Sequence, residues 1–215
     1  MNMRSLEDRL ALYDRIYTTD RLVHPERGKL EPYGSHTNRD KPFIKFLAQN
    51  VQVPGFPIAP PKVLDASCGR GHLARELTKL GYHVDVTEVS PALVESLKAE
   101  FPSARVMDYA YLALMDAKSY DVVISNDVLE HLTENEALAS LEFMRNVSRR
   151  WILISVGLGR GAIKYPEALG LGPVDLHLFT PGAARWEREL QRIGRIAYFE
   201  KNRRTLWAFL EVSGG

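Results

Sequence analysis

The chain has 215 residues, a length that fits one domain or one domain with a small cap. Hydrophobic residues make up 45% and charged residues 26%, the ordinary proportions of a globular protein with a full core. The formal net charge of +1 gives no global reason to expect nucleic acid or an acidic membrane surface as a partner.

The single cysteine, Cys68, excludes an intrachain disulfide and a cysteine-based zinc site, and we expect no bound metal. Acidic residues occur within the first eight positions, so the N-terminus does not resemble a signal peptide. No apolar run approaches the roughly 20 residues that span a membrane. We therefore expect a cytoplasmic protein without a membrane span, whose oligomeric state the sequence does not decide.

Residues 1–60 are predicted to form a helical cap. Apolar residues recur at helical spacing near the N-terminus, and a second apolar cluster around Phe43 indicates another helix. The proline-rich stretch 53–61 then marks a boundary. We expect residues 61–215 to form the core, with the cap as a lid over a ligand site.

From Lys62 onward, strand-like and helix-like runs alternate, which is typical of a parallel sheet covered on both faces. The last two strand-like runs flank a short polar connection and predict an antiparallel hairpin. We thus expect an α/β, doubly wound, mostly parallel seven-stranded sheet with an antiparallel C-terminal hairpin. The predicted strands are 62–66, 83–87, 105–107, 121–125, 151–156, 195–200 and 205–212, and the predicted helices are 72–80, 91–101, 134–146 and 180–193.

Small residues follow the first strand, where Gly69, Gly71 and Ala74 satisfy the G-x-G-x-x-(G/A) dinucleotide fingerprint. Backbone that lies against a ligand needs glycine, because a Cβ would block the approach. A branched side chain at Gly71 is therefore expected to obstruct ligand binding. Glu88 ends the second strand, where a carboxylate can accept hydrogen bonds from both ribose hydroxyls.

Two further strand ends carry polar groups. Asp108 and Tyr109 follow the third strand, where a carboxylate can accept a hydrogen bond from an adenine amine. Asn126 and Asp127 follow the apolar fourth strand. Ligands of open α/β sheets bind outside the carboxyl ends of the strands, so these features converge on one edge.

These segments resemble the class I S-adenosylmethionine (SAM)-dependent methyltransferases, and most closely their small-molecule branch with the quinone-biosynthesis methyltransferases. The resemblance rests on residues 63–73, 84–91, 106–109 and 120–132, and it extends over about 61–212. It implies SAM as cofactor and S-adenosylhomocysteine (SAH) as product.

The resemblance also implies roles for individual residues. Asp65, Gly69 and Gly71 would shape the methionine pocket, and Glu88 would hold the ribose. Asp108 and Tyr109 would frame the adenine, and Asn126 and Asp127 would border the methionine end. Ser67 belongs to the same loop, at a position where the family usually has glycine.

An NAD-dependent oxidoreductase is the weaker alternative for the same fingerprint. In NAD-binding folds the first glycine follows the strand directly, whereas here Asp65 and three small residues intervene. DNA modification is also disfavoured, because the fourth strand lacks the Asn/Asp-Pro-Pro-aromatic motif and the chain has no Pro-Cys pair. The basic residues of the C-terminal region are interpreted as a solvated face.

Three residues are candidates for handling the acceptor's proton: His177, Asp127 and His131. His177 comes first, because it precedes Phe179-Thr180-Pro181 and should lie on the substrate side. His131 could equally be a structural element of its turn. Cys68 is interpreted as a small loop residue rather than a nucleophile, since it has no evident base partner.

The resulting prediction is a methyltransferase that acts on an oxygen or nitrogen of a small molecule, with oxygen ahead of nitrogen. A catalytically silent SAM-binding module that serves a partner protein is the alternative from another class. Within the cap, the candidate substrate contacts are Tyr13, Tyr17, Tyr33 and His36.

Overall fold

The computed structural model describes residues 6–18, 39–53, 55, 58–106, 114–159 and 175–212. These residues form a seven-stranded sheet with the strand order β3-β2-β1-β4-β5-β7-β6. β1 to β5 run parallel, and β7 runs antiparallel to both β5 and β6. The expected fold class is confirmed. The strands are β1 Lys62–Ala66, β2 His83–Glu88, β3 Arg105–Val106, β4 Tyr120–Asn126, β5 Ser148–Gly157, β6 Arg195–Lys201 and β7 Thr205–Glu211.

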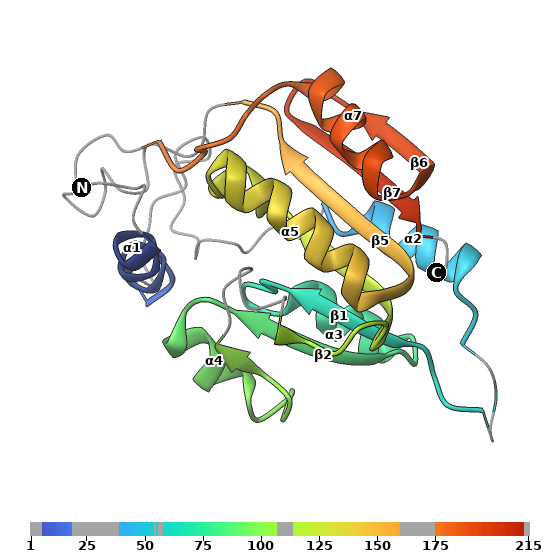
Figure 1. Ribbon diagram of the computed structural model, residues 1–215. Helices are drawn as coiled ribbons and strands as arrows, with labels where there is room; N and C mark the ends of the chain where they lie inside the picture. Colours follow the sequence, from blue (N-terminus) through green and yellow to red (C-terminus); the bar gives the residue numbers. More distant parts are fainter. Residues whose placement is uncertain are drawn as a thin grey trace.

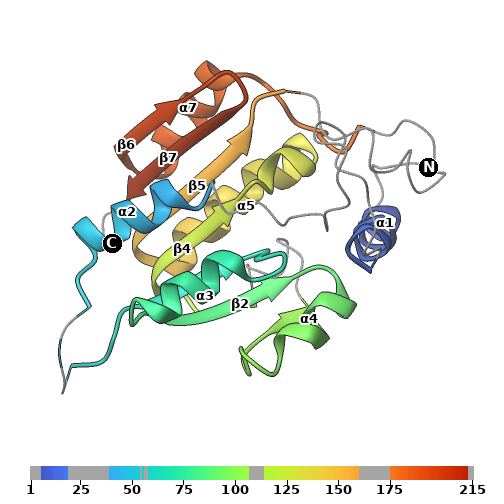
Figure 2. The ribbon, with the colours of Figure 1, turned by 180° about the vertical axis from the view of Figure 1, so that it is seen from behind.

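Helices cover both faces of the sheet, as Figures 1 and 2 show from opposite sides. α5 and α7 lie on one face, where Leu141 and Trp186 pack into the main apolar core. α2 and α3 lie on the other face, where Phe43 and Leu77 pack against β-strand residues such as Leu153. The helices are α1 Leu6–Thr18, α2 Lys41–Asn50, α3 His72–Lys79, α4 Pro91–Leu97, α5 Glu134–Val147 and α7 Ala183–Ile193, with a 3-10 turn η2 at Leu129–His131.

Side chains cap the starts of α4 and α5. The Ser90 hydroxyl accepts from the Leu93 amide (3.3 Å), and the backbone amide of Thr133 donates to the Glu136 carboxylate (2.8 Å). α4 ends at Leu97, earlier than predicted, and residues 98–100 form a turn before Pro102. α7 begins at Ala183 because Gly182 has a φ of 85°, outside the helical region.

α2 belongs with the sheet, and α1 stands apart from it. Phe43 and Leu47 are fully buried on the sheet face. α1 lies beside α4 and near the start of α5, where Arg9 pairs with Glu136 at 2.6 Å. The packing thus favours grouping α2 with the core, whereas the division of the chain at residue 60 stays a prediction.

Among the described residues, no helix has the length and hydrophobicity that crossing a membrane requires.

Candidate functional site

The loop after β1 has an unusual backbone. Ser67, Gly69 and Gly71 all have positive φ values of 59°, 55° and 72°. The loop is held in place where Cys68 N–H donates to Thr87 O (2.9 Å). A positive φ costs a residue with a side chain roughly 1 kcal/mol or more, which explains why glycine is the usual residue at the position of Ser67.

The two glycines of the loop face different neighbours. A Cβ on Gly71 would lie 2.8 Å from Leu97 Cδ2 and would therefore clash with α4. A Cβ on Gly69 would lie 3.4 Å from the hydroxyl oxygen of Tyr17 on α1. A side chain at Gly71 would therefore meet Leu97 first. That it would also obstruct ligand binding stays a prediction.

Asp65 is the penultimate residue of β1, and its carboxyl group is buried. The residue is 1% exposed, and its Oδ2 has no hydrogen-bond partner. Burial, followed by the nearby Asp40 and Glu88 carboxyls, raises the pKa of Asp65 to about 8. A cationic group placed beside this carboxyl would relieve the cost of ionising it.

Glu88 ends β2 and is 2% exposed. Its carboxylate accepts hydrogen bonds from the backbone amides of Gly69 (2.8 Å) and Val89 (2.8 Å). Burial raises the pKa of Glu88, and these amide hydrogen bonds oppose that shift. The structure thus joins the first loop to the end of β2 through this carboxylate.

Asp108 and Tyr109 lie outside the described residues.

At the end of β4, Asn126 and Asp127 share a partner on β5. The Ser155 hydroxyl donates to Asn126 Oδ1 (2.7 Å) and accepts from the Asp127 amide (3.0 Å). Asp127 has a φ of 55° and forms an ion pair with Arg39. Sequence reasoning missed Ser155, whose position in an apolar strand gives little sign of this contact.

Asp40 is a second residue that sequence reasoning missed. It precedes α2, is 4% exposed and accepts a hydrogen bond from Asn126 Nδ2 (2.9 Å). Burial raises the pKa of Asp40 to about 6, Asn126 opposes that shift, and Asp127 adds to it. The sequence feature that could have identified Asp40 is its position as an acidic residue immediately before Lys41-Pro42, where a helix begins.

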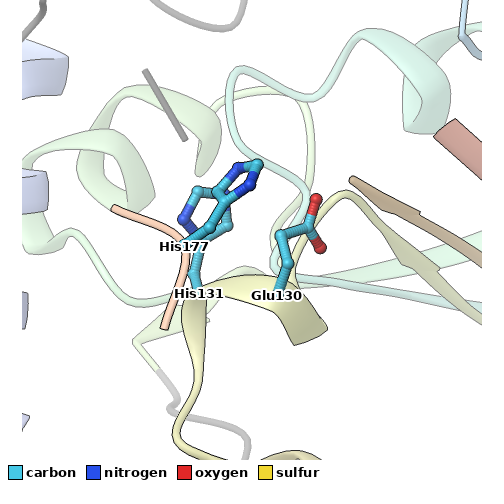
Figure 3. Close-up of side chains that lie close together, drawn as sticks. All are labelled: Glu130, His131 and His177. Atoms are coloured by element: carbon cyan, nitrogen blue, oxygen red, sulfur yellow. The ribbon is translucent and has the colours of Figure 1, made fainter. Parts of the chain in front are cut away.

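η2 places Glu130 and His131 beside His177, which precedes α7, and Figure 3 shows the three side chains close together. The imidazole rings meet edge to face with their centroids 4.7 Å apart. Burial, with a smaller contribution from His177, lowers the pKa of His131 to about 3, so that ring is neutral. Burial also lowers the pKa of His177 and raises the pKa of Glu130 to about 8.

α1 contacts the segments that follow β1, β2 and β4. Tyr13 Oη lies 2.7 Å from His131 Nδ1, and Tyr17 O accepts from the Arg70 guanidinium (2.9 Å). Asp14 accepts from the Ser90 hydroxyl at 2.6 Å. Tyr33 and His36 lie outside the described residues. Tyr13 thus lies beside the turn after β4 and Tyr17 beside the loop after β1, whereas their contact with a substrate stays a prediction.

An open hollow of about 480 Å³ adjoins the same edge, because Thr205 pairs with Gly157 at the end of β5. It is lined by Arg39, Asn202, Arg203, Arg204, Thr205 and Trp207.

Cys68 is a free thiol whose pKa is raised by burial, which agrees with its interpretation as a loop residue. Trp151, Trp186 and Trp207 are buried.

Sequence comparison supports the resemblance. Residues 64–150 match the model of a methyltransferase domain family. The chain is 30% identical over 98 residues to the chloroplastic magnesium protoporphyrin IX methyltransferase of Arabidopsis thaliana. This match covers 43% of this chain and 31% of that protein. It is 24% identical over 149 residues to the ubiquinone biosynthesis O-methyltransferase of Xylella fastidiosa, covering 63% of this chain and 57% of that protein. The chain thus spans less than two thirds of the length of both relatives.

Solved structures share the fold over nearly the whole chain. The magnesium protoporphyrin IX methyltransferase from Synechocystis, solved with SAH bound, has a TM-score of 0.67 at 22% identity, covering 98% of this chain and 96% of that chain. The 1,6-didemethyltoxoflavin-N1-methyltransferase of Burkholderia thailandensis has a TM-score of 0.66 at 14% identity, covering 97% and 91%.

Proposed function

We propose that this chain, which carries a class I methyltransferase domain, transfers the methyl group of SAM to an oxygen or nitrogen of a small molecule. The matched domain and the fold shared with solved methyltransferases support the proposal. The observation that carries it is the pair of buried carboxyls, Asp65 and Glu88, at the glycine-bearing loop. A location in the cytoplasm and the absence of a nucleic-acid partner are part of this proposal.

The residues present fit SAM. The cofactor carries a sulfonium and an ammonium group, and the unpartnered Asp65 Oδ2 offers a buried acceptor next to the loop. The buried hydroxyl of Ser67 also has an oxygen without a partner. We assign Glu88 to the ribose hydroxyls, because its carboxylate lies at the loop after β1, where it accepts a hydrogen bond from the Gly69 amide. Asn126 would border the methionine end, and Asp108 and Tyr109 stay predicted adenine contacts.

Bound SAM supplies an electrophilic methyl group, so the protein's main task is to align the acceptor and exclude water. α1 supports this role, since it reaches from Ser90 to His131 across the strand ends. Tyr13 and Tyr17 are the cap residues we expect to approach the acceptor. We expect the acceptor molecule to enter through the hollow beside Arg39.

His177 remains the first candidate for taking the acceptor's proton. Its Nδ1 donates to Gly159 O (2.6 Å), which leaves Nε2 as an acceptor, and its lowered pKa keeps the ring neutral at pH 7. Asp127 is the second candidate. His131 is better suited to positioning, because its Nδ1 is engaged by Tyr13 and the Leu176 carbonyl.

Titration calorimetry with SAM, SAH and NAD tests the proposal. We expect SAM and SAH to bind and NAD not to bind. Glu88→Ala should weaken SAM binding by about 1–3 kcal/mol, the range for losing a charged hydrogen-bond partner. Glu95→Ala, an exposed carboxylate on α4 that pairs with Lys98, is the matched control and should bind SAM like the wild type.

NAD binding without SAM binding would overturn the proposal. SAM binding without turnover on a broad panel of hydroxyl and amine acceptors would instead favour a silent SAM-binding module.

A further inference from the structure

Three side chains that are typical metal ligands meet beside the proposed acceptor site. Glu130 and His131 come from η2 and His177 from the segment before α7, and one ligand atom of each lies within 4.8 Å of the others (Figure 3). A cation with bonds of about 2.1 Å needs its ligand atoms roughly 3 Å apart, a difference that small side-chain rotations can close. The sequence pattern alone does not predict this meeting, because His177 lies far along the chain.

Both imidazoles are oriented by backbone carbonyls. His131 Nδ1 lies 2.9 Å from Leu176 O, and His177 Nδ1 lies 2.6 Å from Gly159 O. A carbonyl oxygen can only accept a hydrogen bond, so in each ring Nδ1 carries the hydrogen and Nε2 carries the lone pair. Metal-bound histidines characteristically have their other ring nitrogen held by such a carbonyl.

The Glu130 carboxyl supplies an independent observation. Glu130 is 1% exposed, and its Oε1 accepts from the Gly157 amide at 2.6 Å. Its Oε2 is buried without a hydrogen-bond partner. A buried carboxyl oxygen without a partner is costly, and a bound cation would satisfy it.

The local backbone also makes room for the cluster. A Cβ on Gly157 would lie 2.7 Å from His177 Cε1 and 2.9 Å from Glu130 Oε1. The end of β5 therefore accommodates these two side chains only because residue 157 has no side chain.

We propose that Glu130, His131 and His177 form a binding site for a divalent transition-metal ion, with Mn²⁺, Fe²⁺ or Zn²⁺ as the fitting class. Two imidazoles and one carboxylate suit these ions, whereas Mg²⁺ and Ca²⁺ prefer oxygen ligands throughout. Three protein ligands leave further coordination positions open for a substrate atom.

The consequence for catalysis rests on the proposed function. A hydroxyl bound to the cation loses its proton more readily, and the proton passes to solvent water. The oxygen's electron pair then forms the new C–O bond, while the pair of the breaking C–S bond returns to sulfur and SAH leaves. In the metal-bound protein His177 acts as a ligand rather than as the proton acceptor.

Metal binding by the full-length chain tests the proposal directly. The protein is stripped with a chelator, dialysed, and titrated calorimetrically with MnCl₂ and with ZnCl₂. We expect one ion per chain for at least one of the two salts. His177→Ala and Glu130→Gln should each weaken binding at least tenfold, the latter keeping the shape of the side chain and an oxygen for the Gly157 amide.

His83→Ala is the matched control, because His83 is an exposed histidine on β2 and its loss should leave the affinity unchanged. A second measurement needs no variant. Substoichiometric Mn²⁺ should broaden the imidazole NMR signals of His131 and His177 before that of His83.

Absence of binding, equal binding by all variants, or broadening of His83 alone would overturn the metal site. SAM binding measured separately keeps the two proposals apart, since the protein could bind SAM and use His177 as a base without any metal.

Discussion

The hydroxyl of Tyr13 lies 2.7 Å from Nδ1 of His131, so a helix at the start of the chain touches the turn after β4. The two rings also meet edge to face at 5.6 Å. This contact couples the position of α1 to the histidine cluster. Displacing α1 would therefore change both the cover over the strand ends and the surroundings of His131.

Tyr13→Phe should make local opening of α1 more frequent. The variant keeps the ring contact but loses the hydroxyl, which contributes about 1 kcal/mol. We expect faster amide hydrogen exchange in residues 6–18, measured by mass spectrometry. Tyr82→Phe, which loses a bond to the Val51 carbonyl instead, should leave exchange in α1 unchanged. Equal exchange in the wild type and Tyr13→Phe would show that the contact does not hold α1.

Two shortened chains should behave differently. Removing residues 1–18 takes away α1 only, so we expect a folded protein that binds SAM and loses methyl transfer. Removing residues 1–56 also removes α2, whose buried Phe43 and Leu47 each stabilise the fold by about 1.5–3 kcal/mol.

The longer deletion should therefore unfold at a much lower urea concentration than the shorter one, as measured by circular dichroism. A longer deletion that is as stable as the full chain would mean that α2 adds nothing to the core.

Ser67→Gly should stabilise the protein by up to about 1 kcal/mol, because Ser67 has a φ of 59° and a buried hydroxyl without a partner. Ser67→Ala removes the hydroxyl but keeps the strained backbone, so its gain should be smaller. Urea unfolding of the three proteins measures both effects. A Ser67→Gly variant less stable than the wild type would contradict this account of the loop.

Gly157→Ala should disturb the histidine cluster, since the added methyl would lie 2.7 Å from His177 Cε1. We expect a stability loss of about 1–3 kcal/mol and shifted NMR signals of His177, with SAM affinity unchanged. Gly55→Ala is the control, because a Cβ there meets nothing within 4 Å. Unshifted His177 signals in Gly157→Ala would show that the ring does not contact this position.

The buried acids predict a pH dependence of stability without ligand. Burial raises the pKa of Asp40 from 3.8 to about 6, with Asn126 opposing the shift and Asp127 and Glu76 adding to it. The folded state therefore binds this proton more tightly than the unfolded chain. The resulting stabilisation is fully present below pH 3.8 and is lost as the pH rises through 6.

Asp40→Asn keeps an oxygen for Asn126 and removes the titration. Its stability relative to the wild type should rise by about 1–3 kcal/mol between pH 4 and pH 7, as measured by urea unfolding. A difference between the two proteins that stays constant over this range would show that Asp40 is not buried as described.

Much of the fold could be predicted because its signals are local. β1 was predicted at its observed bounds, since apolar runs and their flanking glycines depend only on neighbouring residues. The convergence of Asp65, Glu88 and Asn126 on one edge also follows from a general property of parallel sheets.

The tertiary structure alone decided which residues from distant segments meet at that edge. Asp40 reaches Asn126, Tyr13 reaches His131, and His177 reaches the turn that carries Glu130. Such contacts depend on how α1, α2 and the segment before α7 pack against the rest of the protein. The spacing of apolar residues in the sequence does not predict that packing. The folded structure also decides that a side chain added at Gly71 would meet Leu97, because the φ of residue 71 and its neighbours are fixed only in the folded chain.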